Sequence, residues 1–244
     1  MRALSAAELL SVWERGLSLS PSERALDLLA TACPDSSAVE LSVLSVGQRD
    51  ARLLSLRELT FGSELSALMN CPACGSQLQL TFDLADIRMT GEDKTAETRS
   101  LSLNNYDIRF RLPNSLDLGA LAAAESAGPG TTLLLKRCVL SARHQGAEVD
   151  IEELPDEILN AIDLQMDHAD PQADVQLSPE CLQCKHSWQV PFAIEAFFWR
   201  EIQAWAERTL REVHLLARAY GWREADILNM SPRRRWSYIE MLGT

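Results

Sequence analysis

Four cysteines in two short motifs are the residues of this chain whose types and spacing could do chemistry. The first motif is Cys71-Pro-Ala-Cys74-Gly, and the second is Cys181-Leu-Gln-Cys184. We call each a hook, because a Cys-x-x-Cys loop turns two thiolates toward one ion. Two hooks supply four soft ligands, the tetrahedral set that Zn²⁺ takes in structural sites. The spacing therefore predicts one structural Zn²⁺ per chain, bound by all four cysteines.

Other interpretations of the hooks stay open. A thioredoxin-like redox dithiol would open a helix, whereas each hook precedes a run of alternating residues typical of a strand, Gln77–Phe82 and Ser187–Val190. Two disulfides or a coincidence of two pairs are conceivable, but nothing at the N-terminus resembles a signal peptide for an oxidising compartment. His186 could replace Cys184 as a ligand, although it lies at the start of a strand. A hook followed by a strand, twice over, is the zinc-ribbon pattern.

The sequence patterns around the hooks predict an α+β fold, in which strands and helices position the four cysteines. Residues 61–92 and 175–192 form a four-cysteine zinc ribbon that is split by an α/β insertion at 98–170. Helical segments flank it at 1–60 and 193–244. Helix caps are expected at Ser5 and at Ser20, the second with proline at the first helical position. A further helix is expected over 47–59, and a long one over 192–220 ends at the C-cap candidate Gly221.

The insertion has its own turn and cap signals. A hairpin is expected from residues 100–103 and 107–112, with Asn104-Asn105 as the turn. Ser115 is expected to cap a helix that Gly128-Pro129-Gly130 breaks, and further helices follow over 131–143 and from Pro155. An acidic patch then precedes the second hook, and we interpret it as a solvated, mobile linker. Its residues are Asp163, Asp167, His168, Asp170 and Asp174.

Composition excludes several classes of function. The formal charge is −12 over 244 residues, which argues against a nucleic-acid binder, since that needs a basic face. No apolar run is long enough to span a membrane.

Cys33 and Cys138 lie in apolar, helix-like stretches and are expected to be buried and inert.

The search for catalytic residues is mostly negative. The chain has no Gly-x-Ser-x-Gly, no His-Glu-x-x-His and no phosphate-binding glycine loop. Its four histidines lack positioned partners in the sequence, and His214 has Glu212 on a different helical face. We therefore expect no enzymatic activity.

The C-terminal segment differs in charge from the rest. From Trp199 onward the chain has eight arginines against six acids. Three of these arginines fall in the first turn of the last predicted helix, where the helix dipole disfavours cations. An acidic face within the chain or on a partner could compensate, or the side chains could simply reach solvent. Our hypothesis is a partner-binding element formed by Tyr220, Trp222, Arg233, Arg234, Arg235 and Trp236.

Two stretches of the chain resemble a known family. Residues 211–239, from Arg-Glu-Val-His to Ser-Tyr-Ile, resemble the C-terminus of the T4-type bacteriophage base-plate protein family. Residues 47–62, followed by the Cys-Pro-x-Cys-Gly hook, resemble zinc-bearing members from contractile, phage-tail-like injection particles, and Phe110-Arg-Leu-Pro113 adds a loose likeness. A weaker similarity, at Tyr220-Gly-Trp222 and the helices after it, is to tail assembly chaperones, which act on the tape-measure protein.

The resemblance implies a non-enzymatic component of such a particle, acting at the baseplate or as an assembly factor. Its expected partners are other tail, baseplate or tape-measure proteins, with no nucleic acid and no membrane span. Assembly would take place in the cytoplasm, and the protein could be retained in the particle. The alternative is a zinc-ribbon adaptor or transcription-associated protein unrelated to tails.

Overall fold

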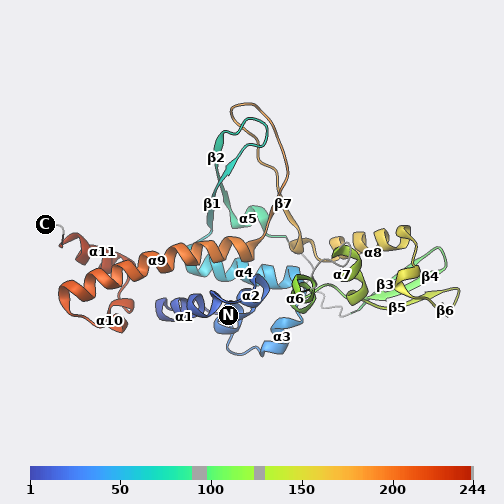
Figure 1. Ribbon diagram of the computed structural model, residues 1–244, viewed down its shortest axis with the longest axis horizontal. Helices are drawn as coiled ribbons and strands as arrows, with labels where there is room; N and C mark the ends of the chain where they lie inside the picture. Colours follow the sequence, from blue (N-terminus) through green and yellow to red (C-terminus); the bar gives the residue numbers. More distant parts are fainter. Residues whose placement is uncertain (90–97, 124–129, 243–244) are drawn as a thin grey trace.

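The computed structural model describes residues 1–89, 98–123 and 130–242. It is an α+β structure of helices and small antiparallel sheets. Figure 1 shows an elongated molecule with a helical body at its centre and an arm that projects from the body. An insertion lobe lies at one end of the long axis, and a C-terminal helical module at the other.

The body is built from helices at both ends of the chain. Each of its first four helices begins at a serine N-cap, and in every case the third helical residue closes a capping box. The predicted caps at Ser5 and Ser20 are thereby confirmed. The body helices are α1 (Ala6–Gly16), α2 (Pro21–Ala32), α3 (Ala38–Ser42), α4 (Val46–Phe61) and the N-terminal half of α9 (Ile194–Tyr220).

One hydrophobic core joins the N-terminal helices to α9. Leu53, Leu54 and Leu56 of α4 and Phe198 and Ile202 of α9 are all fully buried in it. On the edge of this core, the Arg57 guanidinium forms an ion pair with Glu201 at 2.6 Å. The helical segments before the first hook and after the second hook thus pack as one unit.

The arm contains both hooks. Its hairpin pairs β1 (Glu64–Asn70) with β2 (Gln77–Asp83), and the short helix α5 (Leu84–Ile87) follows. The returning chain pairs β7 (Val175–Leu177) with β8 (Val190–Phe192). The strand predicted over 187–190 is shorter in the structure and begins later, at Val190. Ser187 makes only an isolated bridge with Glu180. Pairing with β7 brings Phe192 between Phe82 and Phe197, with ring centroids 5.8 and 5.4 Å away.

The insertion lobe has a separate core and its own sheet, ordered β3-β4-β5-β6. The predicted hairpin is confirmed, since Asn104 and Asn105 both have positive φ, at 50° and 62°. The elements are β3 (Arg99–Leu103), β4 (Tyr106–Phe110), α6 (Ser115–Ala123), α7 (Gly130–Cys138), β5 (Val139–His144), β6 (Ala147–Glu148) and α8 (Asp156–Ala169), with 3-10 turns η1 (Ile151–Glu153) and η2 (Pro171–Ala173).

Two predictions for the lobe were wrong in detail. The helix expected over 131–143 ends at Cys138, because the following residues pair with β4 as β5 and Val139 lies opposite Phe110. Asn114, not Ser115, caps α6: its Oδ1 accepts from the N–H groups of Leu116 and Asp117 at 3.0 and 3.2 Å. The predicted break at Gly128-Pro129 lies outside the described residues.

The C-terminal module is a small helical hairpin with a third core of its own. Gly221 ends α9 in the left-handed region, at φ 70°, as predicted. The chain then turns into α10 (Glu224–Leu228) and α11 (Pro232–Glu240), which both pack on the C-terminal half of α9. Val213, Leu216 and Ile227 are buried at the centre of this core.

Candidate metal centre

The four hook cysteines meet in one cluster. The Sγ atoms of Cys71 and Cys184 are 3.7 Å apart, and those of Cys74 and Cys181 are also 3.7 Å apart. All four sulfurs lie within 4.8 Å of one another. A tetrahedral ion with bonds of about 2.3 Å to sulfur separates its ligands by about 3.8 Å. The cluster therefore has the size of a four-cysteine metal site, and the sulfurs are too far apart for disulfides.

Backbone hydrogen bonds within the first hook fold it into a tight turn. The Cys71 N–H donates to the carbonyl of Ser76, and the Gly75 N–H donates to the carbonyl of Cys71, both at 2.9 Å. This tight turn needs a left-handed residue after the second cysteine, and Gly75 supplies it at φ 73°. The glycine of the Cys-Pro-x-Cys-Gly motif is thus explained by the fold of the loop.

The second hook repeats this geometry with different residues. The Cys181 N–H donates to the carbonyl of His186, and the Lys185 N–H donates to the carbonyl of Cys181, both at 2.8 Å. Lys185 adopts the left-handed backbone conformation that Gly75 adopts in the first hook, with φ at 60°. His186 has its ring stacked near Trp188 at 5.8 Å and is not part of the sulfur cluster. The structure thus assembles Cys184, and not His186, with the other thiols.

Electrostatics in the cluster favour a bound cation. Hydrogen bonds from the Ser76 side chain and backbone lower the pKa of the Cys74 thiol to about 6. A backbone hydrogen bond at His186 lowers the pKa of Cys184, but desolvation and the neighbouring thiols outweigh it and raise that pKa to about 12. Thiolates this close repel one another, so a divalent ion is needed to hold all four deprotonated. The four cysteines could hold a metal ion.

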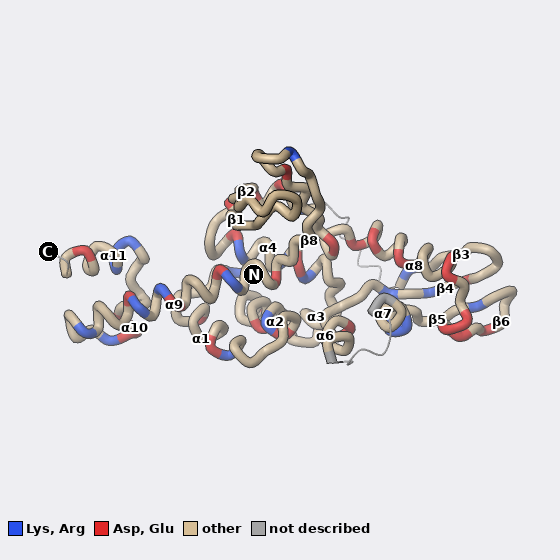
Figure 2. Tube along the Cα trace, turned by 45° about the horizontal axis from the view of Figure 1, so that its top comes forward, with Lys and Arg blue, Asp and Glu red and all other residues tan. Residues whose placement is uncertain are grey.

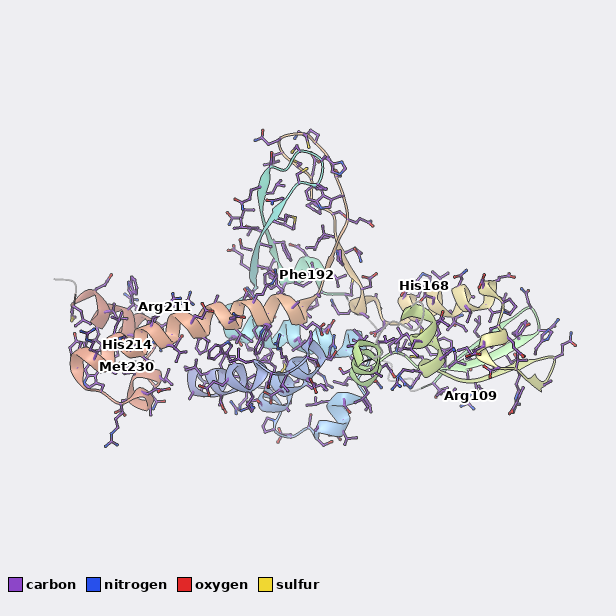
Figure 3. The ribbon with its side chains drawn as sticks, in the orientation of Figure 1. Arg109, His168, Phe192, Arg211, His214 and Met230 are labelled. Atoms are coloured by element: carbon purple, nitrogen blue, oxygen red, sulfur yellow. The ribbon has the colours of Figure 1, made fainter. Side chains whose placement is uncertain are left out.

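The foot of the arm joins the cysteine cluster to the body. Figure 3 shows Phe192 at this foot, next to α9. Phe82 and Phe197 flank Phe192, and Leu65 of β1 and Val175 of β7 are buried in the core of the body. The base of the arm is therefore fixed by packing, while the two hooks meet at its far end.

A family model described as "T4 bacteriophage base plate protein" matches residues 18–199. The chain belongs to this family. The match contains both hooks and the stretch over 47–62 that resembles zinc-bearing members, but it ends before the similar stretch at 211–239. No curated protein and no solved structure matches the chain. Within the described residues, no helix is long and apolar enough to cross a membrane.

The family match leaves the other cysteines and the histidines without an assigned role. Cys33 and Cys138 are buried, at 8% and 0% exposure, as predicted. Burial raises the pKa of Cys138 to about 11, which disfavours its thiolate. The histidines come from β5, α8, the second hook and α9, and Figure 3 shows His168 and His214 at opposite ends of the molecule. The described residues thus contain no histidine cluster suited to catalysis.

The proposed partner-binding residues fall into a buried and an exposed group in the structure. Arg235 is 2% exposed, and its Nε donates to Glu212 at 2.8 Å, so its compensating acid lies within the chain. Trp222 is half-buried, stacked on Tyr220 with ring centroids 4.5 Å apart. Arg233 and Arg234 are exposed on the first turn of α11, and Trp236 is 58% exposed. Arg235 therefore stabilises the C-terminal module from within, and we no longer count it among the residues of the candidate partner surface.

The acidic patch before the second hook is not a mobile linker. Asp163, Asp167 and His168 lie on α8, but Asp170 is buried at the junction of the lobe and the body. Its carboxylate accepts from the Gly47 N–H at 2.8 Å. The only sequence signal for this contact was a glycine in the first turn of a helix, which alone does not identify a partner.

Proposed function

We propose that this chain is a non-enzymatic component of a contractile, phage-tail-like injection particle. It acts at the baseplate or as a factor in baseplate or tail assembly, through contacts with other particle proteins. The observation that carries the proposal is the base plate family match over residues 18–199, which contains α2 to α4 of the body, both hooks and the insertion lobe. A structural family is consistent with the lack of a histidine cluster among the described residues. Assembly in the cytoplasm is part of the proposal.

The metal of this proposal is Zn²⁺ in a structural role. Four thiolates complete a tetrahedral shell and leave no open position for a substrate or water. The ion supplies a crosslink between β1–β2 and the chain that returns from the lobe. Cys71 and Cys181 are buried and Cys74 and Cys184 are exposed, so the ion would lie near the surface of the arm.

The partner surface of this proposal is α11 with the end of α9. Ser231 caps α11 through the Arg234 N–H, at 3.3 Å, yet every charged residue of the first turn that follows is a cation. Arg235 is neutralised by Glu212, whereas Arg233 and Arg234 are exposed beside Trp236. Figure 2 shows Lys and Arg positions on α11 at one end of the molecule and Asp and Glu positions on α8 toward the other. Arg and Trp are enriched at interface hot spots, and an acidic partner would complement the two arginines.

The test is affinity capture from cells that produce the whole particle. The tagged chain should retain baseplate, tail or tape-measure proteins, and cells lacking the chain should fail to make complete particles. Normal particles in those cells, together with a tagged chain that purifies alone, would overturn the proposal.

A matched pair of charge reversals tests the surface itself. Arg233→Glu with Arg234→Glu should abolish capture, while the melting temperature is unchanged or raised because acids suit a helix N-terminus. The control is Arg109→Glu with Arg143→Glu, which makes the same charge change at exposed positions of the lobe. Figure 3 shows Arg109 at the far end of the molecule from Arg211. Equal capture by both double variants would place the interface elsewhere.

A further inference from the structure

The arm leaves the outer edges of both β1 and β2 open, and the edge of β2 is the one that adjoins a groove. β1 and β2 form a two-stranded sheet, and the chain after the second hook pairs with β7 instead of joining them. Among the described residues, no strand pairs with the outer edge of β2. An exposed edge carries unpaired N–H and C=O groups, which are a template for another strand.

The register of the hairpin shows which backbone groups face outward. At the tip, the Cys71 N–H donates to Ser76, and at the foot the Leu84 N–H donates to Ser63, at 2.9 and 3.0 Å. Directly opposed residues of an antiparallel ladder alternate between hydrogen-bonded and non-hydrogen-bonded pairs. The pairs at both ends are hydrogen-bonded, which fixes the alternation for every pair between them.

The outward-facing residues of β2 follow from this alternation. Gln77, Gln79 and Thr81 belong to the non-hydrogen-bonded pairs of the register. Their N–H and C=O groups therefore point away from β1, toward the open edge. The intervening Leu78 and Leu80 make the ladder bonds to β1. An added strand would meet six outward backbone groups along about 17 Å of edge, the span of about five residues.

A groove of about 370 Å³ lies beside this edge. It is lined by residues 78–81 of β2, by Met69 of β1, and by Pro179, Glu180 and Leu182 of the returning chain. Met69 lies opposite Leu78 in the ladder, so the groove covers the face of the hairpin that carries Leu78 and Leu80, and it also contacts Gln79 and Thr81 of the open edge. Leu182, on the opposite wall, is 76% exposed. One wall thus offers backbone hydrogen bonds, and the other offers apolar contact.

The charge of the arm selects the chemistry of the occupant. Residues 64–86 and 175–192 contain Glu64, Asp83, Asp86 and Glu180 against a single base, Lys185. A divalent ion with four thiolates adds two further negative charges. An acidic segment would be repelled from this arm, whereas a basic one would be attracted.

We propose that the edge of β2 binds an extended segment of a partner protein, as a third strand of the ribbon. The segment alternates apolar residues, which pack against Leu78, Leu80 and Leu182, with basic residues. Main-chain bonds to Gln77, Gln79 and Thr81 hold it, and the apolar positions select it. This surface is separate from α11, so the chain would contact partners at two places.

The experiment selects random twelve-residue peptides, presented in a display library, on the metal-loaded full-length protein. The enriched peptides should alternate apolar and basic residues. Thr81→Pro removes one outward N–H without breaking the ladder and should weaken their binding at least tenfold. The control is Ser66→Pro: Ser66 lies opposite Thr81 and faces the other edge, so this variant should bind as the wild type does.

A second pair of variants does not disturb the backbone. Leu182→Lys removes an exposed apolar wall and adds a like charge for a basic segment, so binding should again fall at least tenfold. Ala73→Lys makes the same charge change on the other hook, outside the groove, and should leave binding unchanged. The proposal is overturned if no peptide is enriched, or if Leu182→Lys binds the enriched peptides as tightly as Ala73→Lys. It is also overturned if a folded Thr81→Pro variant binds like Ser66→Pro.

Discussion

The carboxylate of Asp170 accepts a hydrogen bond from the Gly47 N–H, with 2.8 Å between Oδ2 and N. The first N–H groups of a helix have no partner within the helix, and Gly47 is the second residue of α4. An acid from the last residues of the lobe, at its junction with the body, thus acts as an additional N-terminal cap for a body helix. This contact anchors the chain just before it enters the arm through β7.

The absence of a side chain at Gly47 makes this contact possible. A Cβ there would lie 2.1 Å from Asp170 Oδ1 and 3.0 Å from the Ala173 backbone nitrogen. Gly47→Ala should therefore lower the free energy of unfolding by about 1–3 kcal/mol, as overpacking does. Urea unfolding measures this. Gly119→Ala is the control, because a Cβ at Gly119 meets nothing within 4 Å, and it should be neutral or stabilising. Equal effects of the two substitutions would contradict the close approach.

Removal of the metal should loosen the arm more than the lobe. Freshly prepared, reduced protein should contain one Zn²⁺ by elemental analysis, and Cys74→Ser should contain none and be poorly soluble. After chelation, amide exchange should accelerate in β1 and β2, while α8 stays protected because the lobe has its own core. Equal acceleration in the arm and the lobe would show that the lobe depends on the ion.

Asp50 should make stability depend on pH. Burial raises its pKa to about 6 although Arg49 opposes the shift. The unfolded chain releases this proton near pH 4 and the folded chain only near pH 6. The contribution of Asp50 to the free energy of unfolding is therefore fully present below pH 4. It is lost as the pH rises to about 6, and the loss is on the order of 2 kcal/mol.

The measurement for Asp50 compares Asp50→Asn with the wild type by urea unfolding at pH 4.5 and 7. The variant should be more stable relative to the wild type at pH 7 than at pH 4.5. Both proteins share the same hooks, so any pH dependence of the metal site cancels in the comparison. A difference that does not change with pH would show that Asp50 titrates normally.

Loss of Arg235 should unfold the C-terminal module. Its guanidinium bonds to Glu212 and to the Met230 carbonyl, both at 2.8 Å. Arg235→Ala leaves Glu212 without its partner and should cost about 3 kcal/mol in thermal or urea unfolding. Arg233→Ala, on the exposed side of α11, should cost less than about 0.5 kcal/mol. Similar costs for both would argue against the buried ion pair.

Cys33 and Cys138 should resist thiol reagents in the native protein. Both are buried, and the raised pKa of Cys138 leaves little thiolate at neutral pH. With metal bound, labelling should require unfolding, so its rate should rise with urea in step with the loss of helix. Rapid labelling of Cys138 in native protein, followed by disulfide-linked dimers without reductant, would contradict its burial.

The sequence by itself determined the local features. Serine caps, the Asn104-Asn105 turn, the glycine after α9 and the spacing within each hook depend on interactions among residues close together in the chain. The four cysteines were identified for the same reason, since a Cys-x-x-Cys loop is a local structure and the soft ligand set needs only a count of thiols.

Only the tertiary structure decided which distant groups meet. The contacts of Asp170 with Gly47, of Arg235 with Glu212 and of Phe192 with Phe82 join segments that sequence periodicity treats separately. Residues 139–144 resemble the end of a helix because their apolar spacing fits both periods, and pairing with β4 selects the strand. Strand pairing and buried charge depend on long-range packing, and no window of local sequence contains the partner.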